Sequence, residues 1–149
     1  MFNVAYRIVN NREEAEDMLL EAFTDCFRSI GSYKSQGTFG AWLKTIVINK
    51  CINRLRKKEA DLVYIDDYGP FERSEEEPAG EWPDASVIAK AVEKLPDGYR
   101  VVFSLYLLEG YDHAEISQIM NISESTSKTQ YLRAKEKLKK ILLTMKKDG

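Results

Sequence analysis

An acidic segment in the middle of the chain, Glu59–Ser86, constrains the fold more than any other feature, because helical periodicity stops where it begins. It holds one arginine and ten aspartates or glutamates, a net charge of −9, and shows no sustained 3.6-residue period. Its helix-breaking residues are Gly69, Pro70, Pro78, Gly80 and Pro83. Proline interrupts helices, and like charges extend a chain. The sequence therefore predicts a flexible acidic linker over 59–86, between an N-terminal domain at 1–58 and a C-terminal domain at 87–149.

Apolar periodicity on both sides of this segment predicts an all-α protein made of two small helical domains. Apolar residues recur at spacings of three and four from Arg12 until Gly31, which is expected to end that helix. Its expected buried stripe is Ala15, Leu19, Ala22, Phe23, Cys26, Phe27 and Ile30. The next helix is expected to bury Phe39, Trp42, Leu43, Ile46, Val47 and Leu55. Further helices are expected from Val87 to about Met145, and no strand pattern persists.

Several absences narrow the range of functions. No apolar run approaches the roughly 20 residues of a membrane span, and the N-terminus lacks a signal-peptide layout. We therefore expect a cytoplasmic protein without membrane insertion. Cys26 and Cys51 fall on apolar faces and are expected to be buried thiols, with a disulfide or metal pair as the alternative. His113 is the single histidine and is expected at the surface. Without a phosphate-binding loop, a Ser/Cys–His pair or a metal-ligand set, no enzyme, metal or cofactor is predicted.

The C-terminal part contains the pattern of a helix-turn-helix. Asp112 is a suitable N-cap for a short helix, "NIS" makes a turn, and Ser123 is a suitable N-cap for a longer helix. In this arrangement the first residues of the second helix enter the major groove of DNA. Residues 125–147 carry eight basic side chains and one acid, although the whole chain has a net charge of −2. The alternative is a solvated charged face on a C-terminal helix.

Seven side chains of this second helix are predicted to contact DNA. Lys128 and Gln130 suit guanine and adenine edges respectively, whereas Arg133 and Lys135 can reach phosphates. The full predicted set is Ser125, Thr126, Ser127, Lys128, Gln130, Arg133 and Lys135.

Motifs in both parts resemble one family. The stretches "LPDGYRVVF", "LLEGYDHAEIS" and "STSKTQYLRAK" resemble region 4 of the extracytoplasmic-function (ECF) sigma factors, small alternative sigma factors of bacterial RNA polymerase. "EEAEDMLLEAF" and "FGAWLKTIVINKCINRLRK" resemble region 2 of the same family. The chain departs from the family pattern at Leu20, usually glutamine, at Ser127, usually valine, and at Gln130, usually arginine. The family also has most of a further helix before "MFNVAYRIV", so region 2 is expected to be truncated, by the expressed chain or the gene start.

The resemblance implies a sigma factor that binds core RNA polymerase and recognises minus-ten and minus-thirty-five promoter DNA, with an anti-sigma factor as a further partner. Region 2 would bind polymerase through Glu16, Asp17, Leu20 and Glu21. It would bind the minus-ten element through Tyr33, Lys34, Ser35, Thr38, Lys44, Asn49, Lys50, Asn53, Arg54 and Arg56, with the loop and Asn49 receiving an extruded base. The alternative is a stand-alone helix-turn-helix regulator that does not bind polymerase. It would leave the region-2 motifs unexplained.

Overall fold

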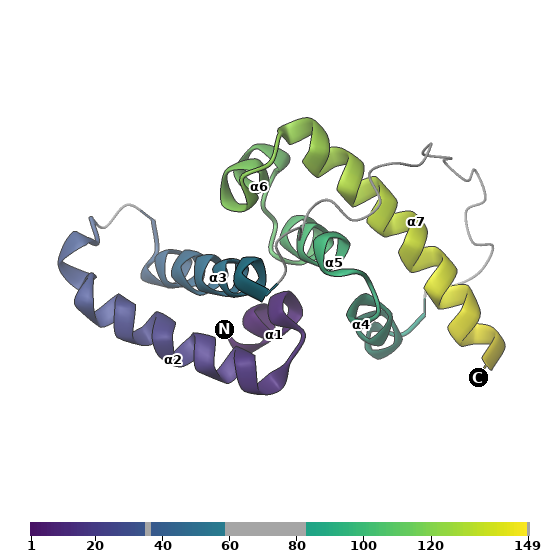
Figure 1. Cartoon of the computed structure of the whole chain (residues 1–149), viewed down its shortest axis with the longest axis horizontal. Coiled ribbons are helices and arrows are strands. Elements are labelled where there is room, and N and C mark those ends of the chain that lie inside the picture. The colour runs from purple at the N-terminus through teal and green to yellow at the C-terminus, as the bar shows by residue number, and fades with distance from the viewer. Residues whose placement is uncertain (35–36, 59–82, 149) are drawn as a thin grey trace. The chain divides into compact units, whose positions relative to one another are not determined.

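The computed structural model describes residues 1–34, 37–58 and 83–148, and every regular element in these ranges is a helix (Figure 1). The all-α prediction is therefore confirmed. The chain divides into two compact units, one with helices α1 to α3 and the other with α4 to α7. Ser35 and the predicted linker from 59 to 82 lie outside the described residues. The last residues of that predicted linker are partly helical, because α4 begins at Ala85 and not at Val87.

The first unit contains α1 (Phe2–Val9), α2 (Arg12–Arg28), the short 3-10 turn η1 (Ile30–Ser32) and α3 (Phe39–Lys58). Asn10 ends α1 in the left-handed conformation, at φ 53°. The side chain of Asn11 then accepts a hydrogen bond from the Glu14 amide (3.0 Å) and caps α2. Each of the three helices contacts the other two (Figure 1). A tight two-residue turn therefore sets α1 and α2 against the same partner, α3.

Small side chains bring α2 against its neighbours. Its buried residues are Ala15, Met18, Ala22 and Cys26. The expected burial of Phe23, Phe27 and Ile30 is wrong: these side chains are 41%, 74% and 53% exposed. Alanine and cysteine allow close helix packing, and Phe23, Phe27 and Ile30 lie outside this packed face. The helix also ends at Arg28, before Gly31, because the chain continues as η1.

Both cysteines are free thiols inside the first unit, as the packing interpretation predicted. Cys51 is fully buried, and this burial raises the pKa of its thiol to about 12. A thiol that stays protonated at neutral pH is a poor nucleophile and a poor metal ligand. Cys51 therefore acts as a small apolar side chain in the core.

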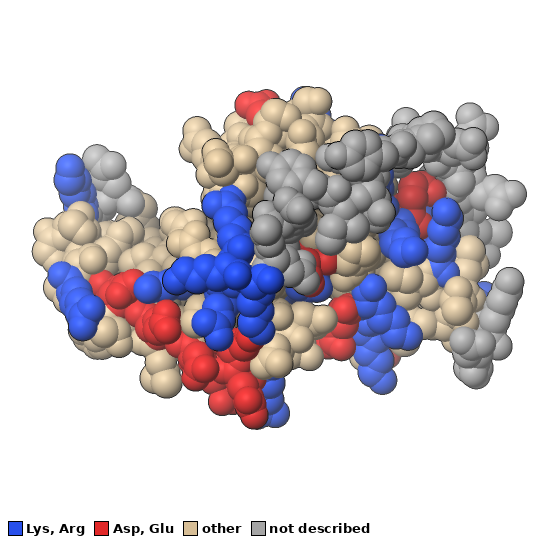
Figure 2. All heavy atoms as spheres, in the orientation of Figure 1, with Lys and Arg blue, Asp and Glu red and all other residues tan. Residues whose placement is uncertain are grey.

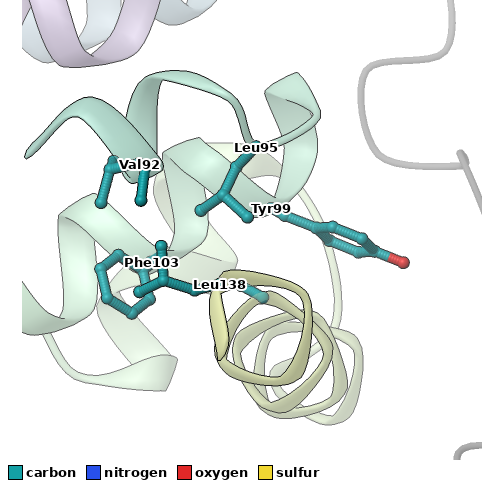
Figure 3. Packing of buried hydrophobic residues seen from close by; sticks show 7 residues of the cluster. Val92, Leu95, Tyr99, Phe103 and Leu138 are labelled. Carbon is teal, nitrogen blue, oxygen red and sulfur yellow. The ribbon is translucent and has the colours of Figure 1, made fainter. Parts of the chain in front are cut away.

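The second unit contains α4 (Ala85–Glu93), α5 (Asp97–Phe103), the π-helical turn η2 (Ser104–Leu108), α6 (His113–Met120) and α7 (Glu124–Asp148). Its core is formed where α4 and α5 pack on the middle of α7. Val92, Leu95, Phe103 and Leu138 converge there, while the Tyr99 hydroxyl points away from the cluster (Figure 3). This core holds the long helix α7 in place and leaves its first turns to α6.

A wide turn connects α5 to α6. The Glu109 amide donates to the Ser104 carbonyl and the Tyr111 amide to the Leu105 carbonyl, both at 3.0 Å. Gly110 has a φ of 79°, a left-handed conformation that glycine adopts without steric cost. The π-helical turn leaves Leu107 and Leu108 exposed.

Candidate functional site

Helices α6 and α7 form the predicted helix-turn-helix. Asp112 caps α6 in a reciprocal capping box: its carboxylate accepts from the Glu115 amide (2.8 Å), and the Glu115 carboxylate accepts from the Asp112 amide (3.2 Å). Asn121 ends α6 at φ 56°. The Ser123 hydroxyl then accepts from the Thr126 amide (3.0 Å) and caps α7. Both predicted N-caps are confirmed, and the turn between the helices has a fixed geometry.

One face of α7 is buried in the second unit. Ser127 and Gln130 are 0% and 1% exposed, and Ala134 and Leu138 continue the same face at helical spacing. A buried side chain cannot reach a base edge. The prediction that Gln130 and Ser127 contact DNA is therefore wrong, because residues at these positions pack against the rest of the unit.

The opposite face of α7 is exposed and keeps the other predicted residues. Ser125, Lys128 and Lys135 are exposed and lie three and seven residues apart, on one side of the helix. Thr126 and Arg133 are half-buried. The Thr126 hydroxyl accepts a hydrogen bond from Ser123 (2.8 Å), so it is engaged in the cap. Lys135 lies over the Tyr131 ring, 5.7 Å from its centroid. Lys128 is thus an exposed basic side chain in the first turns of α7.

His113 is half-buried at the start of α6, rather than a plain surface residue as predicted. Its Nδ1 lies 2.8 Å from the Ser127 hydroxyl, and its ring stacks on Tyr106 at 4.4 Å and 12°. Burial lowers the pKa of His113, as does the nearby charge of Lys128, while Asp112 and Glu124 oppose the shift. The ring therefore favours its neutral form.

In the first unit, an aromatic cluster stands where the loop before α3 meets the helix. The rings of Tyr33, Phe39 and Trp42 lie 5.2 to 5.8 Å apart, and the Tyr33 hydroxyl donates to the Gly37 carbonyl (2.9 Å). The Thr38 hydroxyl accepts from the Ala41 amide (3.1 Å) at the start of α3. Phe39 is 45% exposed and Trp42 half-buried, so the predicted burial of Phe39 in the core is wrong. Lys34 is exposed beside this cluster.

The polar side of α3 lies next to the acids of α2. Asn49, Asn53, Arg54 and Arg56 are exposed, whereas Lys44 and Lys50 are half-buried. Lys50 pairs with Asp25 (2.7 Å) and, more distantly, with Glu21 (3.8 Å). The hydrogen bond to Asp25 raises the pKa of Lys50. Figure 2 shows the acidic side chains along α2 and the basic ones beside them near the end of α3.

A second set of ion pairs joins the same two helices near the end of α3. Glu14 of α2 pairs with Lys58 and lies 4.0 Å from Arg54. Two predicted DNA-binding cations of α3, Lys50 and Arg54, therefore already have acidic partners in α2.

The outward face of α2 is partly acidic and partly apolar. The predicted contacts Glu16, Asp17, Leu20 and Glu21 are all exposed. Leu20 begins an exposed apolar stripe that continues through Phe23, Phe27 and Ile30, at spacings of three and four. The last three were expected in the core. Leu20 is 68% exposed. The small residues Ala15, Ala22 and Cys26 of the expected stripe are buried, and their size was the signal that this side of the stripe packs most closely.

Within 1–34, 37–58 and 83–148, no group of three or more His, Cys, Asp or Glu side chains could hold a metal ion. Among the helices described here, none combines the length and the apolar character that crossing a membrane requires.

Comparison with known proteins agrees with this geometry. Residues 1–60 match the family model of sigma-70 region 2, and residues 86–138 match that of sigma-70 region 4. The two units thus define a protein of the sigma-70 class, with the helix-turn-helix inside region 4.

Among curated proteins, the ECF RNA polymerase sigma factor SigW of Bacillus subtilis is 33% identical, over 95% of this chain and 82% of SigW. SigM of the same organism is 32% identical, over 92% of this chain and 87% of SigM. The chain belongs to the ECF sigma factors. A solved structure of similar fold is the sigma factor RpoE of Bartonella quintana in complex with the anti-sigma factor NepR. It has a TM-score of 0.64 and 22% identity, over 95% of this chain and 88% of that one.

Proposed function

We propose that this protein binds core RNA polymerase and directs promoter-specific initiation of transcription, acting in the cytoplasm as a regulatory and not a catalytic factor. The observation that carries the proposal is the presence of both sigma-70 regions in one chain, each folded around its own core. A stand-alone helix-turn-helix regulator would need only the second unit. The first unit, with its exposed acidic and apolar face, has no role in that alternative.

The polymerase contact is assigned to α2. Glu16, Asp17 and Glu21 are exposed acids, and the apolar stripe runs through Leu20, Phe23 and Phe27 of the same helix to Ile30 in η1. Exposed apolar side chains of this size gathered on one helix typically mark a protein interface. An acidic rim suits a basic partner surface, and the apolar stripe supplies the affinity that exposed charges alone do not.

The minus-ten contact is assigned to the loop before α3 and to the exposed side of that helix. Removing a base from the duplex stack costs a few kcal/mol. Aromatic side chains can offset this cost by stacking, and basic side chains can follow the separated strand. The rings on the loop side are those of Tyr33, Phe39 and Trp42. Lys34 and Thr38 lie between Tyr33 and Phe39 in the sequence, and Asn49 lies two turns after Trp42 on α3. Lys44, Lys50, Asn53, Arg54 and Arg56 complete this proposed surface.

The minus-thirty-five contact is assigned to the exposed face of α7. Lys128 suits a guanine edge, and Ser125 is short enough to allow close approach. Arg133 and Lys135 lie further along the helix, where phosphates are reached in a helix-turn-helix complex. Thr126 contributes by fixing the cap that presents these residues.

Transcription in vitro tests the proposal. Core polymerase, with and without the purified chain, would be incubated with a library of promoters, and the transcripts sequenced. We expect transcripts that depend on the chain and that share two sequence elements upstream of the start. DNA binding without capture of core polymerase would instead support the stand-alone regulator.

An anti-sigma factor is proposed as the regulator of this protein. The support is its membership of the ECF family together with the exposed apolar stripe on α2, which a protein partner would cover in the absence of polymerase. Competition between core polymerase and the candidate partner for the purified chain would test this.

A further inference from the structure

The buried polar contact between the two helices of the helix-turn-helix has no role in the assignments above. We propose that His113 is a positioning residue for promoter recognition: by bonding to buried Ser127 and stacking on Tyr106, it fixes the rotation of α7 about its axis and thereby aims Lys128 and Ser125 at the DNA. The inference rests on the proposed minus-thirty-five function of α7.

The contact links three elements of the second unit. His113 is the first residue of α6, Ser127 lies in the first turns of α7, and Tyr106 belongs to η2. Tyr131 of α7 closes the cluster, 4.4 Å from the Tyr106 ring and 6.0 Å from His113. The imidazole is therefore held by a stack on one side and by a directional hydrogen bond at Nδ1.

Ser127 is the residue through which this contact can act on DNA binding. It is fully buried, so removing its partner leaves a buried hydroxyl without a hydrogen bond, which destabilises this arrangement of the helices. Lys128 follows Ser127 directly, and successive helical residues point about 100° apart. A hydrogen bond that fixes the direction of Ser127 consequently fixes the direction of Lys128. The residue usual at this position in the ECF sigma factors is valine, which packs without such a directional bond.

The protonation state of His113 makes the contact sensitive to pH. In the neutral ring with its proton on Nε2, Nδ1 accepts the Ser127 hydroxyl proton. Protonation would reverse this bond and place a cation beside Lys128 and near the N-termini of α6 and α7, which disfavour positive charge. Asp112 and Glu124 partly compensate, while burial raises the pKa of the neighbouring Tyr131 hydroxyl, which keeps it uncharged. The pKa of His113 lies below the usual 6.5, so the ring is neutral and the contact intact at neutral pH. The contact weakens as the pH falls through the pKa of His113.

The test compares holoenzymes containing wild type, His113→Ala, His113→Asn, Ser127→Ala and the double variant His113→Ala/Ser127→Ala. The two DNA duplexes are a promoter selected for the wild type and the same promoter with its minus-thirty-five element scrambled. The ratio of the two affinities is measured from pH 5.5 to 7.5, well below each protein's melting temperature. Ser117→Ala is the matched control, since that hydroxyl bonds only within α6 to the Ala114 carbonyl.

We expect His113→Ala and Ser127→Ala each to lower the affinity ratio by about three- to tenfold, and the double variant to lose little more, because the two residues share one contact. Asn carries an acceptor near the place of Nδ1 and should restore part of the ratio. The wild-type ratio should fall on acidification, and the ratios of the His113 variants should stay flat.

Three results would overturn the inference: an unchanged ratio in His113→Ala, a loss explained entirely by the unfolded fraction, or wild-type affinities for both duplexes that rise together at acid pH. The last would make His113 a phosphate contact. A wild-type holoenzyme that selects no promoter would instead contradict the proposed function itself.

Discussion

At the residue scale, α7 shows why a motif predicts a role more reliably than it predicts each side chain that performs it. The motif places the N-terminal residues of α7 near DNA, and both capping residues, Asp112 and Ser123, behave as their local sequence indicates. Which of those residues point outward depends on how α7 is rotated against its neighbours. That rotation is set by distant partners such as His113, and no local pattern contains it.

Lys128 should contribute to both affinity and specificity. It is an exposed basic side chain in the first turns of α7, so Lys128→Ala removes one positive charge and one donor at the base edges. We expect weaker binding of the minus-thirty-five duplex by about tenfold and a salt slope reduced by about one. Titrations of labelled duplex at several salt concentrations would measure both. An unchanged slope would argue against contact between Lys128 and DNA.

Gln130 should matter for folding and not for the sequence recognised. Its side chain is 1% exposed, so Gln130→Ala removes a buried polar side chain and leaves space behind. We expect the free energy of unfolding to fall by about 1–3 kcal/mol. Thermal melting followed by circular dichroism would measure the loss. Promoter selection with the folded variant should return the wild-type motif, and a changed motif would contradict the observed burial.

At the scale of elements, the helices were predictable and the faces they bury were predictable only in part. The periods and caps of α2, α6 and α7 define helices from sequence alone. In α2, however, two apolar stripes overlap, one of small residues and one of large residues. Hydrophobicity alone favours the large one, but close packing of α2 on α1 and α3 selects Ala15, Ala22 and Cys26. The large stripe then remains outside, where a partner can use it.

A charge placed in this exposed stripe should weaken polymerase binding and leave the fold intact. Phe27 is 74% exposed, so Phe27→Glu disturbs little of the core. Since a few apolar side chains commonly dominate an interface, we expect affinity for core polymerase to drop about tenfold or more. Leu143→Glu is the matched control, an exposed leucine of the other unit. Fluorescence titration with core polymerase would compare them, and equal affinities would remove α2 from the interface.

The ion pairs between α2 and α3 should restrain DNA binding by the first unit. Asp25→Asn removes the main partner of Lys50, so the ammonium group becomes available to phosphate and its raised pKa should move back toward the ordinary value. Exposed ion pairs contribute little each, so we expect a gain of about two- to fourfold in affinity for single-stranded minus-ten DNA.

Glu13→Gln provides the comparison for this variant, since Glu13 is exposed in the first turn of the same helix and carries an equal charge. If the effect came from net charge alone, both variants would gain equally. A gain confined to Asp25→Asn would locate the restraint at Lys50. Anisotropy titrations at low and high salt would separate the two outcomes.

At the scale of the whole molecule, two units with separate cores are joined by one strongly acidic segment of the sequence. Linking two binding modules makes the second binding event intramolecular, and this raises overall avidity by orders of magnitude without any new contact. A promoter with two separated elements is a target for which such a link is effective. The net charge of −2 for the whole chain hides the basic character of both units, because the negative charge is concentrated in the segment between them.

Cutting the chain between the units should therefore abolish most initiation while each unit keeps its own binding surface. A protease site inserted within 59–82 would allow cleavage of the assembled holoenzyme, with the uncut variant as the matched control. We expect the rate of run-off transcription to fall at least about tenfold on cleavage, because the second unit is then no longer held near the minus-thirty-five element. Polymerase capture of the first unit should persist. Full activity after complete cleavage would mean that each unit is held on the complex by its own contacts, and that the covalent link contributes nothing to promoter recognition.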